Sequence, residues 1–504
     1  MIRQNFNADW TVEKGDGNSR MNSFLGNTQT KTVHLPYDAM IHEARTPDTK
    51  NGAQTGFYPG GEYIFQKHFT APQAWQGKPV SLVFEGVYQT ALVYLNGWLL
   101  TRNVNGYAEF TVEAGPYLKY GADNLMKVIA DNSLEPNSRW YTGSGIYRPV
   151  RLLVGNKVYL PQDTVRITTR EADEGFALLD VTAQVQSAST VTERVTLQQT
   201  ICREGTAVLT DRQNLLLQPG ESRTVSFRYC VDSPALWSPE NPNLYTSTMQ
   251  VLEGEEELDR EETGFGIRTL SIDAAHGVRI NGQTVKLRGA CIHHDNGILG
   301  AATLPDAEER RIRQLKEAGF NAIRSSHHPA GRALLDACDR YGVLVMDELS
   351  DVWNVRKNPY DYALYFEQDW KPTIQKMVAK DYNHPSVILY CVGNEISEAG
   401  SESGAETNRR LCNTFRELDP TRYTTNALNG LMAAGYRLRE IMGDVMRKFP
   451  AQPGPSGGDG GGSAGVSGGR QSTAVRGRGG VCADEPAWAG LRPLSLIHIS
   501  EPTR

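Results

Sequence analysis

Residues 383–395 read Asn-His-Pro-Ser-Val-Ile-Leu-Tyr-Cys-Val-Gly-Asn-Glu, and this stretch decides how the whole chain is interpreted. The apolar run from Val387 to Val392 is typical of a short, fully buried strand. The His-Pro pair before it disfavours a continuing helix. Glu395 follows the strand directly, where an ionisable group is costly unless it is paired, protonated or used. From the spacing alone, a functional carboxylate and a plain carboxylate at the rim of the strand both remain open.

The same residues resemble the acid/base signature of glycoside hydrolase family 2, which contains β-galactosidases, β-glucuronidases and β-mannosidases. The resemblance lies in Asn-His-Pro-Ser-Val followed by Gly-Asn-Glu, and flanking similarity runs from roughly residue 40 to 450. In that family the strand is the fourth of a β/α barrel. The resemblance implies that Glu395 is the general acid/base and that Asn394 hydrogen-bonds to the sugar 2-hydroxyl.

Composition narrows the class of protein. A length of 504 residues allows two to four domains, and a net charge of −6 gives no indication of a nucleic-acid or anionic-membrane partner. The first residues lack an apolar signal segment, and no apolar run approaches the ~20 residues that span a bilayer. The seven cysteines form no Cys-x-x-Cys pair, so no zinc site is expected from them. Cys291 and Cys391 lie in strand-like settings that suit reduced, buried thiols, and we expect a soluble, cytoplasmic protein.

The first half of the chain has the pattern of two β domains. Residues 1–155 contain short alternating runs such as 63–69 and 80–84, separated by turn residues, with an Asn96-Gly97 hairpin signal. Residues 156–268 continue with alternating runs and no residues that indicate chemistry. The family resemblance implies a sugar-binding-like jelly-roll sandwich first and an immunoglobulin-like sandwich second.

An aromatic, glycine-punctuated loop at 139–148 lies near the end of the first domain. From the residues alone it is a turn that carries a packed aromatic side chain. The resemblance implies a loop that leans over the sugar site. Some β-galactosidases of the family have a sugar-binding Asp two residues before the Trp of this loop, and here that position is Ser138, which puts that contact in doubt.

From residue 269 to about 450 strands and helices alternate, which predicts βαβ units and a parallel sheet. We expect a strand at 285–292, helices at 305–319, 331–341, 369–381 and 406–418, and a fifth strand near 421–426. In a barrel, residues just past the carboxyl ends of the strands share one face. We expect that face to collect the following residues: His293, His294, Asp295, His327, His328, Asp347, Glu348, Asn394 and Glu395.

The resemblance assigns roles to several of them. One histidine of the His293-His294 pair, taken as His294, is expected in the substrate pocket, although both could be ordinary rim histidines. His327 is expected to contact substrate, with Arg324 buried beneath the site, and Glu348 to orient the site rather than to cleave. A magnesium site found in one subgroup is not predicted, because Val352 and Asn354 occupy the positions nearest its ligands. No cofactor is predicted.

Retaining glycosidases need a second carboxyl group as the nucleophile, about 5–5.5 Å from the acid/base. In the family it ends the seventh barrel strand, and this chain has no sequence for that strand. Residues 451–504 are rich in glycine and cannot bury a core. Residues 494–504 resemble a translated sequencing adapter. We therefore expect a C-terminally truncated fragment with an incomplete barrel and a disordered or artefactual tail.

These observations predict that the parent is a retaining exo-β-glycosidase, a homo-oligomer acting on terminal β-D-galactosides. The loop from Trp353 resembles that of certain bacterial β-galactosidases in the family. A β-glucuronidase and a noncatalytic carbohydrate-binding protein remain as alternatives, and the fragment itself is expected to be inactive.

Overall fold

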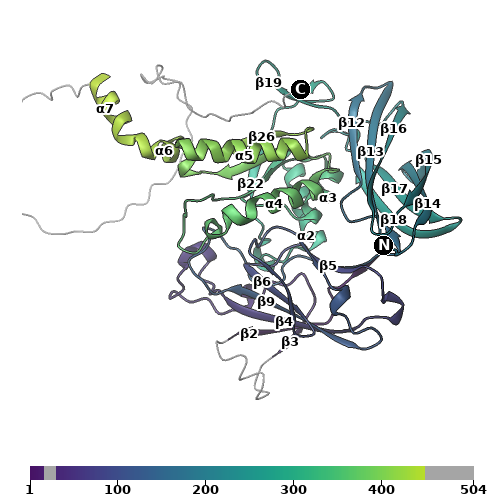
Figure 1. The fold of residues 1–504 in the computed structure, drawn as a ribbon. Coiled ribbons are helices and arrows are strands. Elements are labelled where there is room, and N and C mark those ends of the chain that lie inside the picture. The colour runs from purple at the N-terminus through teal and green to yellow at the C-terminus, as the bar shows by residue number, and fades with distance from the viewer. Residues whose placement is uncertain (16–29, 449–504) are drawn as a thin grey trace, which may run out of the picture.

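The computed structural model describes residues 1–15 and 30–448. The predicted tail at 451–504, including the adapter-like residues, lies outside them. Figure 1 shows two β-rich regions in purple and blue, with a third, mixed region in green packed against both. None of the helices that the structure describes is both long and apolar enough to cross a membrane.

The first region is a sandwich of two antiparallel sheets. One sheet has the order β1-β10-β5-β8, comprising β1 (Ile2–Asn5), β10 (Val150–Val154), β5 (Val80–Phe84) and β8 (Phe110–Glu113). The other has the order β3-β2-β4-β9-β6-β7, comprising β3 (Lys31–Val33), β2 (Trp10–Gly15), β4 (Gly61–Thr70), β9 (Asp123–Asn132), β6 (Thr90–Leu95) and β7 (Trp98–Asn103). Alternate residues of these strands meet in one apolar core.

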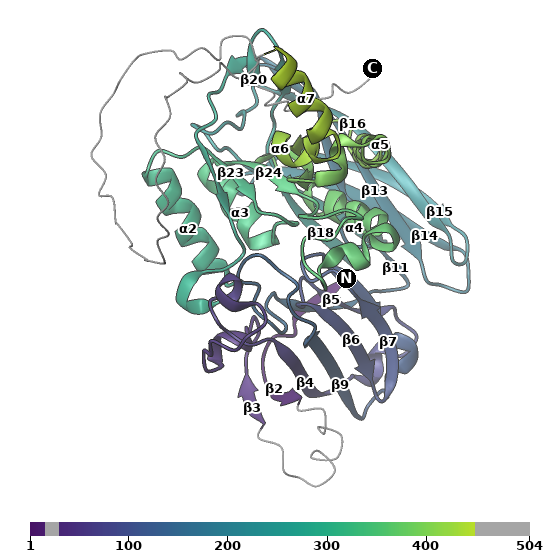
Figure 2. The ribbon, with the colours of Figure 1, turned by 90° about the vertical axis from the view of Figure 1, so that its left-hand side faces the viewer.

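The second region is a smaller sandwich with its own core. One sheet contains β11 (Val158–Tyr159), β13 (Phe176–Ser187), β12 (Arg166–Ala172) and β16 (Ser222–Asp232). The other has the order β15 (Thr206–Leu217), β14 (Glu193–Arg203), β17 (Tyr245–Glu253) and β18 (Glu256–Phe265). Figure 2 shows the two sandwiches as separate bodies, the first below the helical region and the second to its right.

A small antiparallel sheet leads into the third region. It contains β19 (Leu270–Asp273), β20 (Gly277–Ile280) and β21 (Gln283–Thr284). The strand predicted at 285–292 is shorter than expected, because β22 begins only at Gly289. Residues 285–288 instead link the two sheets, with the Val285 amide donating to the Val278 carbonyl at 2.8 Å.

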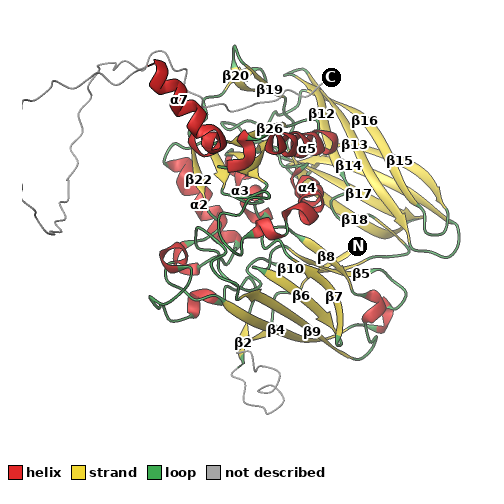
Figure 3. Cartoon of the chain, turned by 60° about the vertical axis from the view of Figure 1, so that its left-hand side comes forward, coloured by secondary structure: helices red, strands yellow, loops and turns green. Residues whose placement is uncertain are grey.

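The third region is a parallel five-stranded sheet with helices on its outer face, as Figure 3 shows. Its strands, in sequence and in space, are β22 (Gly289–Ile292), β23 (Ala322–Ser325), β24 (Leu344–Glu348), β25 (Val387–Asn394) and β26 (Tyr423–Ala427). The helices are α2 (Pro305–Glu317), α3 (Arg332–Tyr341), α4 (Phe366–Asp381), α5 (Glu402–Leu418), α6 (Gly430–Ala433) and α7 (Leu438–Lys448). The prediction of two sandwiches followed by an incomplete β/α barrel is confirmed.

Strand β25 is the centre of this region, and all eight of its residues are buried. The end of the second sandwich holds the turn before it: Arg268 donates from Nε to the Pro385 carbonyl at 2.6 Å and from Nη2 to the Val387 carbonyl at 2.8 Å. The expectation of buried thiols is right for Cys391 and wrong for Cys291, which is exposed. Cys291 lies on β22 at the edge of the sheet, where only one strand neighbours it.

Candidate active site

Polar side chains gather where β23, β24 and β25 end, because the carboxyl ends of parallel strands meet at one edge of a sheet. Arg324 lies near the end of β23, Glu348 is the last residue of β24, and Asn394 is the last residue of β25. Asp347 was expected on the same face, and this is wrong. Successive strand residues point to opposite faces, so Asp347 turns away from Glu348 and accepts a hydrogen bond from the Ala330 amide at 2.9 Å.

A buried ion pair forms the floor of this site. Arg324 donates from Nε to Glu348 Oε2 at 2.9 Å and from Nη2 to Glu348 Oε1 at 2.6 Å. Burial alone would lower the pKa of Arg324, but the hydrogen bonds and charge of Glu348 outweigh it and raise that pKa. His327 Nδ1 lies 3.1 Å from Glu348 Oε2. Both oxygens of Glu348 are therefore engaged, which suits an orienting residue better than a reacting one.

Asn394 is held in one orientation by charged neighbours. Its Oδ1 accepts a hydrogen bond from Arg324 Nη2 at 2.7 Å, and its Nδ2 donates to Asp351 Oδ1 at 2.8 Å. The side chain is buried. Because the carbonyl and amino ends each have a fixed partner, the amide is set before any ligand arrives.

Glu395 differs from its neighbours in backbone conformation and exposure. Its φ is +46°, a region that non-glycine residues seldom adopt and that concentrates at functional sites. The backbone amide donates to the Ala427 carbonyl at 2.7 Å, which ties the residue to β26. The carboxylate is 37% exposed, 3.8 Å from Arg139 Nη1, and accepts a hydrogen bond from Asn429 Nδ2 at 3.3 Å. The carboxylate of Glu395 is therefore accessible at the edge of the sheet, between the side chains of Arg139 and Asn429.

The first sandwich contributes a cation to this edge. Arg139 donates to both oxygens of Asp351, from Nε at 3.1 Å and from Nη2 at 2.6 Å. Lys357 Nζ donates to Asp351 Oδ1 at 2.9 Å and to the Asn394 carbonyl at 2.7 Å. Burial would raise the pKa of Asp351, but its bonds to Arg139 and the charge of Lys357 lower it. The sequence interpretation missed Arg139, Asp351 and Lys357, and the only available signal was the position of Arg139 beside Trp140 in the aromatic loop.

The aromatic loop does lie over the barrel face. The ring of Trp140 is centred 5.1 Å from that of His293 and 5.3 Å from that of His327. His294, the histidine that was assigned to the pocket, is instead buried against Arg148, whose Nη2 is 3.3 Å from its Nδ1. Burial and the charge of Arg148 hold the pKa of His294 well below its usual value. The position of His293 makes it the better candidate for contact with a ligand.

His328 belongs to the contact between the first sandwich and the barrel. Its ring stacks on Tyr107 at 4.3 Å between centroids, with 9° between the ring planes. Burial lowers the pKa of His328 to about 3, so the imidazole is neutral. This histidine therefore supports the domain contact rather than the open edge that carries Glu395.

A small cavity lies beside the aromatic loop, between the first sandwich and the barrel. Its lining includes Ser138, Trp140, His328 and Asp351, and its volume is about 30 Å³. That is room for one or two water molecules and too little for a sugar ring. A sugar would have to bind at the open edge over Glu395 and Trp140.

Each of the three structural regions matches a model of a known protein family. A family model described as the galactose-binding domain-like part of glycosyl hydrolase family 2 matches residues 10–174, and one described as glycosyl hydrolases family 2 matches residues 158–268. The model of the family 2 TIM barrel domain matches residues 274–448. The three matches follow one another along the chain in the order of the three structural regions.

Individual relatives carry two kinds of name. Beta-galactosidase BoGH2A of Bacteroides ovatus is 37% identical over 406 residues, which cover 80% of this chain and 48% of that protein. A putative beta-glucuronidase of Formosa agariphila is 31% identical over 427 residues, which cover 84% of this chain and 40% of that protein. The chain spans about half the length of these curated relatives.

Among solved structures, a glycosyl hydrolase family 2 member from Bacteroides cellulosilyticus superimposes with a TM-score of 0.82 and 35% identity, over 89% of this chain and 60% of that one. The beta-glucuronidase of Bacteroides uniformis gives a TM-score of 0.75 and 25% identity, over 90% of this chain and 58% of that one.

Proposed function

The chain belongs to glycoside hydrolase family 2, and from this premise we propose that the whole enzyme is a retaining exo-β-glycosidase with Glu395 as its general acid/base. The observation that carries the proposal is the position of Glu395 at the end of a fully buried strand. Its carboxylate is accessible there, while Asn394 beside it is locked in place. An accessible carboxyl group over a preorganised polar floor is what protonation of a glycosidic oxygen requires.

In the proposed reaction, Glu395 gives its proton to the oxygen of the leaving group and later takes a proton from the water that attacks the glycosyl-enzyme. A separate carboxylate must form that covalent intermediate. Glu348 is engaged by Arg324 and His327, and Asp351 by Arg139 and Lys357. We therefore propose that the nucleophile lies outside the residues that the structure describes.

Terminal β-D-galactosides are the substrates that we propose. The relative named beta-galactosidase BoGH2A supports this specificity with 37% identity, compared with 31% for a relative named putative beta-glucuronidase and 27% for one named beta-glucuronidase. A β-glucuronidase is the second candidate, because relatives of both names match all three regions. Parallel assays of aryl β-D-galactoside and aryl β-D-glucuronide on the natural full-length enzyme separate the two, and a galactoside preference below tenfold would contradict the first.

The acid/base role is tested by Glu395→Ala in the full-length enzyme. Substrates with poor leaving groups should lose about 10²–10⁴-fold in kcat/KM, because they need protonation, while activated aryl glycosides lose much less in the glycosylation step. Azide should restore turnover of the activated substrates by attacking the glycosyl-enzyme. Glu402→Ala, which changes an exposed carboxylate at the start of α5, is the matched control. Equal losses on both kinds of substrate without azide rescue would remove Glu395 from this role.

A further inference from the structure

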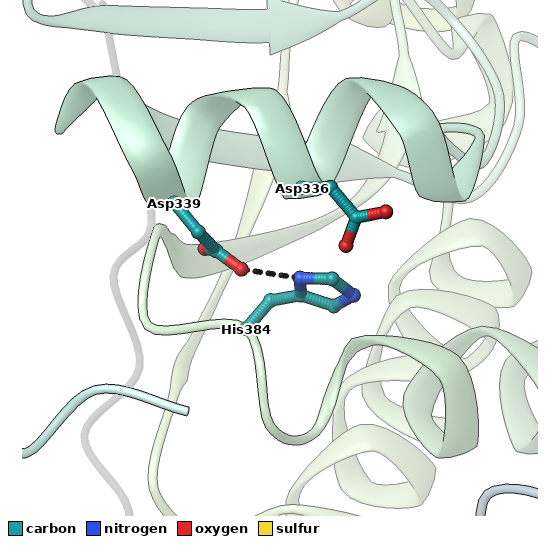
Figure 4. Close-up of side chains that lie close together, drawn as sticks. All are labelled: Asp336, Asp339 and His384. Carbon is teal, nitrogen blue, oxygen red and sulfur yellow. Dashed lines mark hydrogen bonds and ion pairs between the residues drawn. The ribbon is translucent and has the colours of Figure 1, made fainter. Parts of the chain in front are cut away.

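We propose that Asp336, Asp339 and His384 form a binding site for a divalent transition-metal ion such as Zn²⁺, apart from the candidate active site. The two aspartates lie on α3, and the histidine lies in the turn that precedes β25 (Figure 4). The site would join a helix on the outer face of the barrel to the turn from which the central strand starts.

The three side chains converge because of their spacing. Asp336 and Asp339 are three residues apart on one helix, so they share one face of it. One potential ligand atom from each of the three residues lies within 4.8 Å of the others. Figure 4 shows both carboxylates turned from α3 toward the imidazole ring. Ligand atoms of one zinc ion lie roughly 3–3.6 Å apart, so the exposed Asp336 side chain would move toward the other two ligands when an ion binds.

The kinds of ligand atom favour zinc over the alkaline-earth ions. Zinc binds imidazole nitrogen and carboxylate oxygen at about 2.0–2.2 Å, and it accepts water in a remaining position. Calcium and magnesium prefer sites made of oxygen alone. His384 Nδ1 already lies within hydrogen-bond distance of Asp339 Oδ2, at 2.6 Å, and a metal ion between the two atoms would replace that hydrogen bond.

A plain structural role explains two of the three residues. Asp339 Oδ1 accepts a hydrogen bond from the Ser386 amide at 3.0 Å, and its Oδ2 is the partner of His384, so this pair holds the turn before β25. Asp336 makes no hydrogen bond in that arrangement and acts on it through its charge, which, against the lowering effect of burial and after Asp339, helps to raise the pKa of His384. Within residues 1–15 and 30–448 its carboxylate makes no hydrogen bond or ion pair, yet it faces the same imidazole. Asp336 is therefore the residue that distinguishes a metal site from a structural pair.

An ion could reach the site through a cleft between the barrel and the second sandwich. The cleft has a volume of about 510 Å³, and its lining includes the three proposed ligands together with Asp163, Glu261 and Glu262. The cations that also line it already have carboxylate partners: Arg332 pairs with Asp163 and Glu109, Arg340 with Glu309, and Lys380 with Asp381. These three basic side chains are therefore already paired with other carboxylates. Asp336 is left available to bind a cation.

The test is calorimetric titration of the full 504-residue chain with ZnCl₂ after removal of metals with EDTA. Wild-type protein should bind one Zn²⁺ that Asp336→Asn binds at least about tenfold more weakly, since a direct ligand is lost. Because the carboxylate of Asp336 makes no hydrogen bond or ion pair within the described residues, this variant should keep the melting temperature of the metal-free protein. Asp306→Asn makes the same change at an exposed position on α2 and should bind like the wild type.

A variant that restores the ligand completes the test. Asp336→His places another zinc ligand at the same point and should bind Zn²⁺ at least as tightly as the wild type. X-ray absorption of the zinc-loaded wild type should show nitrogen and oxygen ligands with the scattering pattern of imidazole. Equal affinities of wild type and Asp336→Asn, or no saturable Zn²⁺ binding by the wild type, would overturn the proposal.

Discussion

The two sandwiches and the barrel region bury their apolar side chains in different ways. In each sandwich the inner faces of two sheets cover one another, and the alternating residues of both meet in a closed core. In the parallel sheet the outer face is covered by α2 to α5, which form the core cluster of that region. Within the described residues no helix covers the inner face, and its packing is confined to the amino-terminal end of the strands, where Ile272 and Ile280 of the small antiparallel sheet meet Leu344 and Leu389.

The incomplete cover of the inner face leaves apolar surface open to solvent. A groove of about 250 Å³ runs along it, lined mostly by apolar residues from β22 to β25. Leu287 at its border is 42% exposed, and Cys291 is exposed as well. Parallel sheets are normally buried on both faces. The comparison teaches that an antiparallel sandwich completes its core within one stretch of sequence, whereas a parallel sheet depends on elements further along the chain.

The largest expected effect of this difference is on resistance to protease. During digestion of the 504-residue chain by trypsin, we expect a fragment ending near Arg268 to outlast residues 269–448 by about a thousandfold in half-life. The reason is that the open sheet needs less free energy to expose cleavable backbone than two closed cores do. Mass spectrometry of the surviving fragment fixes its end. Equal rates for both halves would show that the open face costs the barrel region little stability.

Elements whose sequence pattern is local could be predicted from the sequence. Periodicity predicted the helices α2, α3 and α4 to within about three residues, and the apolar run identified β25, because these patterns are local. Helix α5 begins earlier than predicted, since Ser401 caps it by accepting from the Gly404 amide at 3.1 Å. That signal was present in the sequence and was missed.

The candidate site was predicted only in part, for a physical reason. Glu395, Asn394, Glu348 and Arg324 lie at strand ends, so their clustering follows from topology. The bond from Arg139 to Asp351 joins residues 212 positions apart in different domains, and no local pattern encodes it. The choice between His293 and His294 depends on which of the two rings the first sandwich covers. That is set by the contact between domains and not by the local sequence.

A second prediction tests the link between the two kinds of region. Arg332 on α3 pairs with Glu109 of the first sandwich at 2.8 Å and with Asp163 of the second at 2.5 Å, and its side chain is 18% exposed. Arg332→Ala should lower the free energy of unfolding by about 3 kcal/mol, because two largely buried carboxylates lose their closest cation and Glu109 keeps a longer contact to Arg151 at 3.4 Å. Calorimetry should then resolve separate transitions for the barrel and the sandwiches.

Arg340→Ala is the control for this experiment. Arg340 lies on the same helix, is 50% exposed, and pairs with Glu309 at 3.0 Å on the surface. Its loss should change the free energy of unfolding by less than about 1 kcal/mol. A single, unshifted transition in Arg332→Ala would mean that this three-domain contact does not couple the regions.

A third prediction uses pH to probe the contact that carries His328. The folded-state pKa of His328 is about 3, below the ordinary value near 6.5, so the unfolded chain binds its proton first as the pH falls. Stability is therefore retained above about pH 6.5 and lost as the pH falls toward 3. Between pH 7.5 and pH 5 this one group should remove about 2 kcal/mol.

His328→Phe isolates that contribution. Phenylalanine keeps an aromatic ring on Tyr107 but cannot be protonated. The variant should lose about 2 kcal/mol less than the wild type over the same pH interval, as measured by urea unfolding at both pH values. Other buried histidines such as His294 remain in both proteins, so their effect cancels in the difference. Parallel pH dependences would show that His328 is not held neutral by the domain contact.

The smallest expected effect lies at the open end of the barrel region, where α6 and α7 extend beyond the sheet (Figure 1). Asn429 caps α6 by accepting hydrogen bonds from the Leu431 amide at 3.2 Å and the Met432 amide at 3.3 Å. Its Nδ2 also donates to Glu395 at 3.3 Å. Asn429→Ala should cost about 1 kcal/mol locally, which corresponds to roughly fivefold faster hydrogen exchange of those two amides.

Asn429→Asp separates the two roles of this residue. Aspartate caps helices about as well as asparagine, so the exchange of the Leu431 and Met432 amides should stay within about twofold of the wild type. The same change replaces a donor to Glu395 with a second negative charge, so the 3.3 Å hydrogen bond is lost and the two carboxylates repel each other. The chemical shift of the Glu395 carboxyl carbon in carbon-detected NMR spectra should therefore change. If exchange quickens equally in both variants, the cap does not hold α6. An unchanged carboxyl-carbon shift of Glu395 in Asn429→Asp would mean that Asn429 does not act on the candidate acid/base.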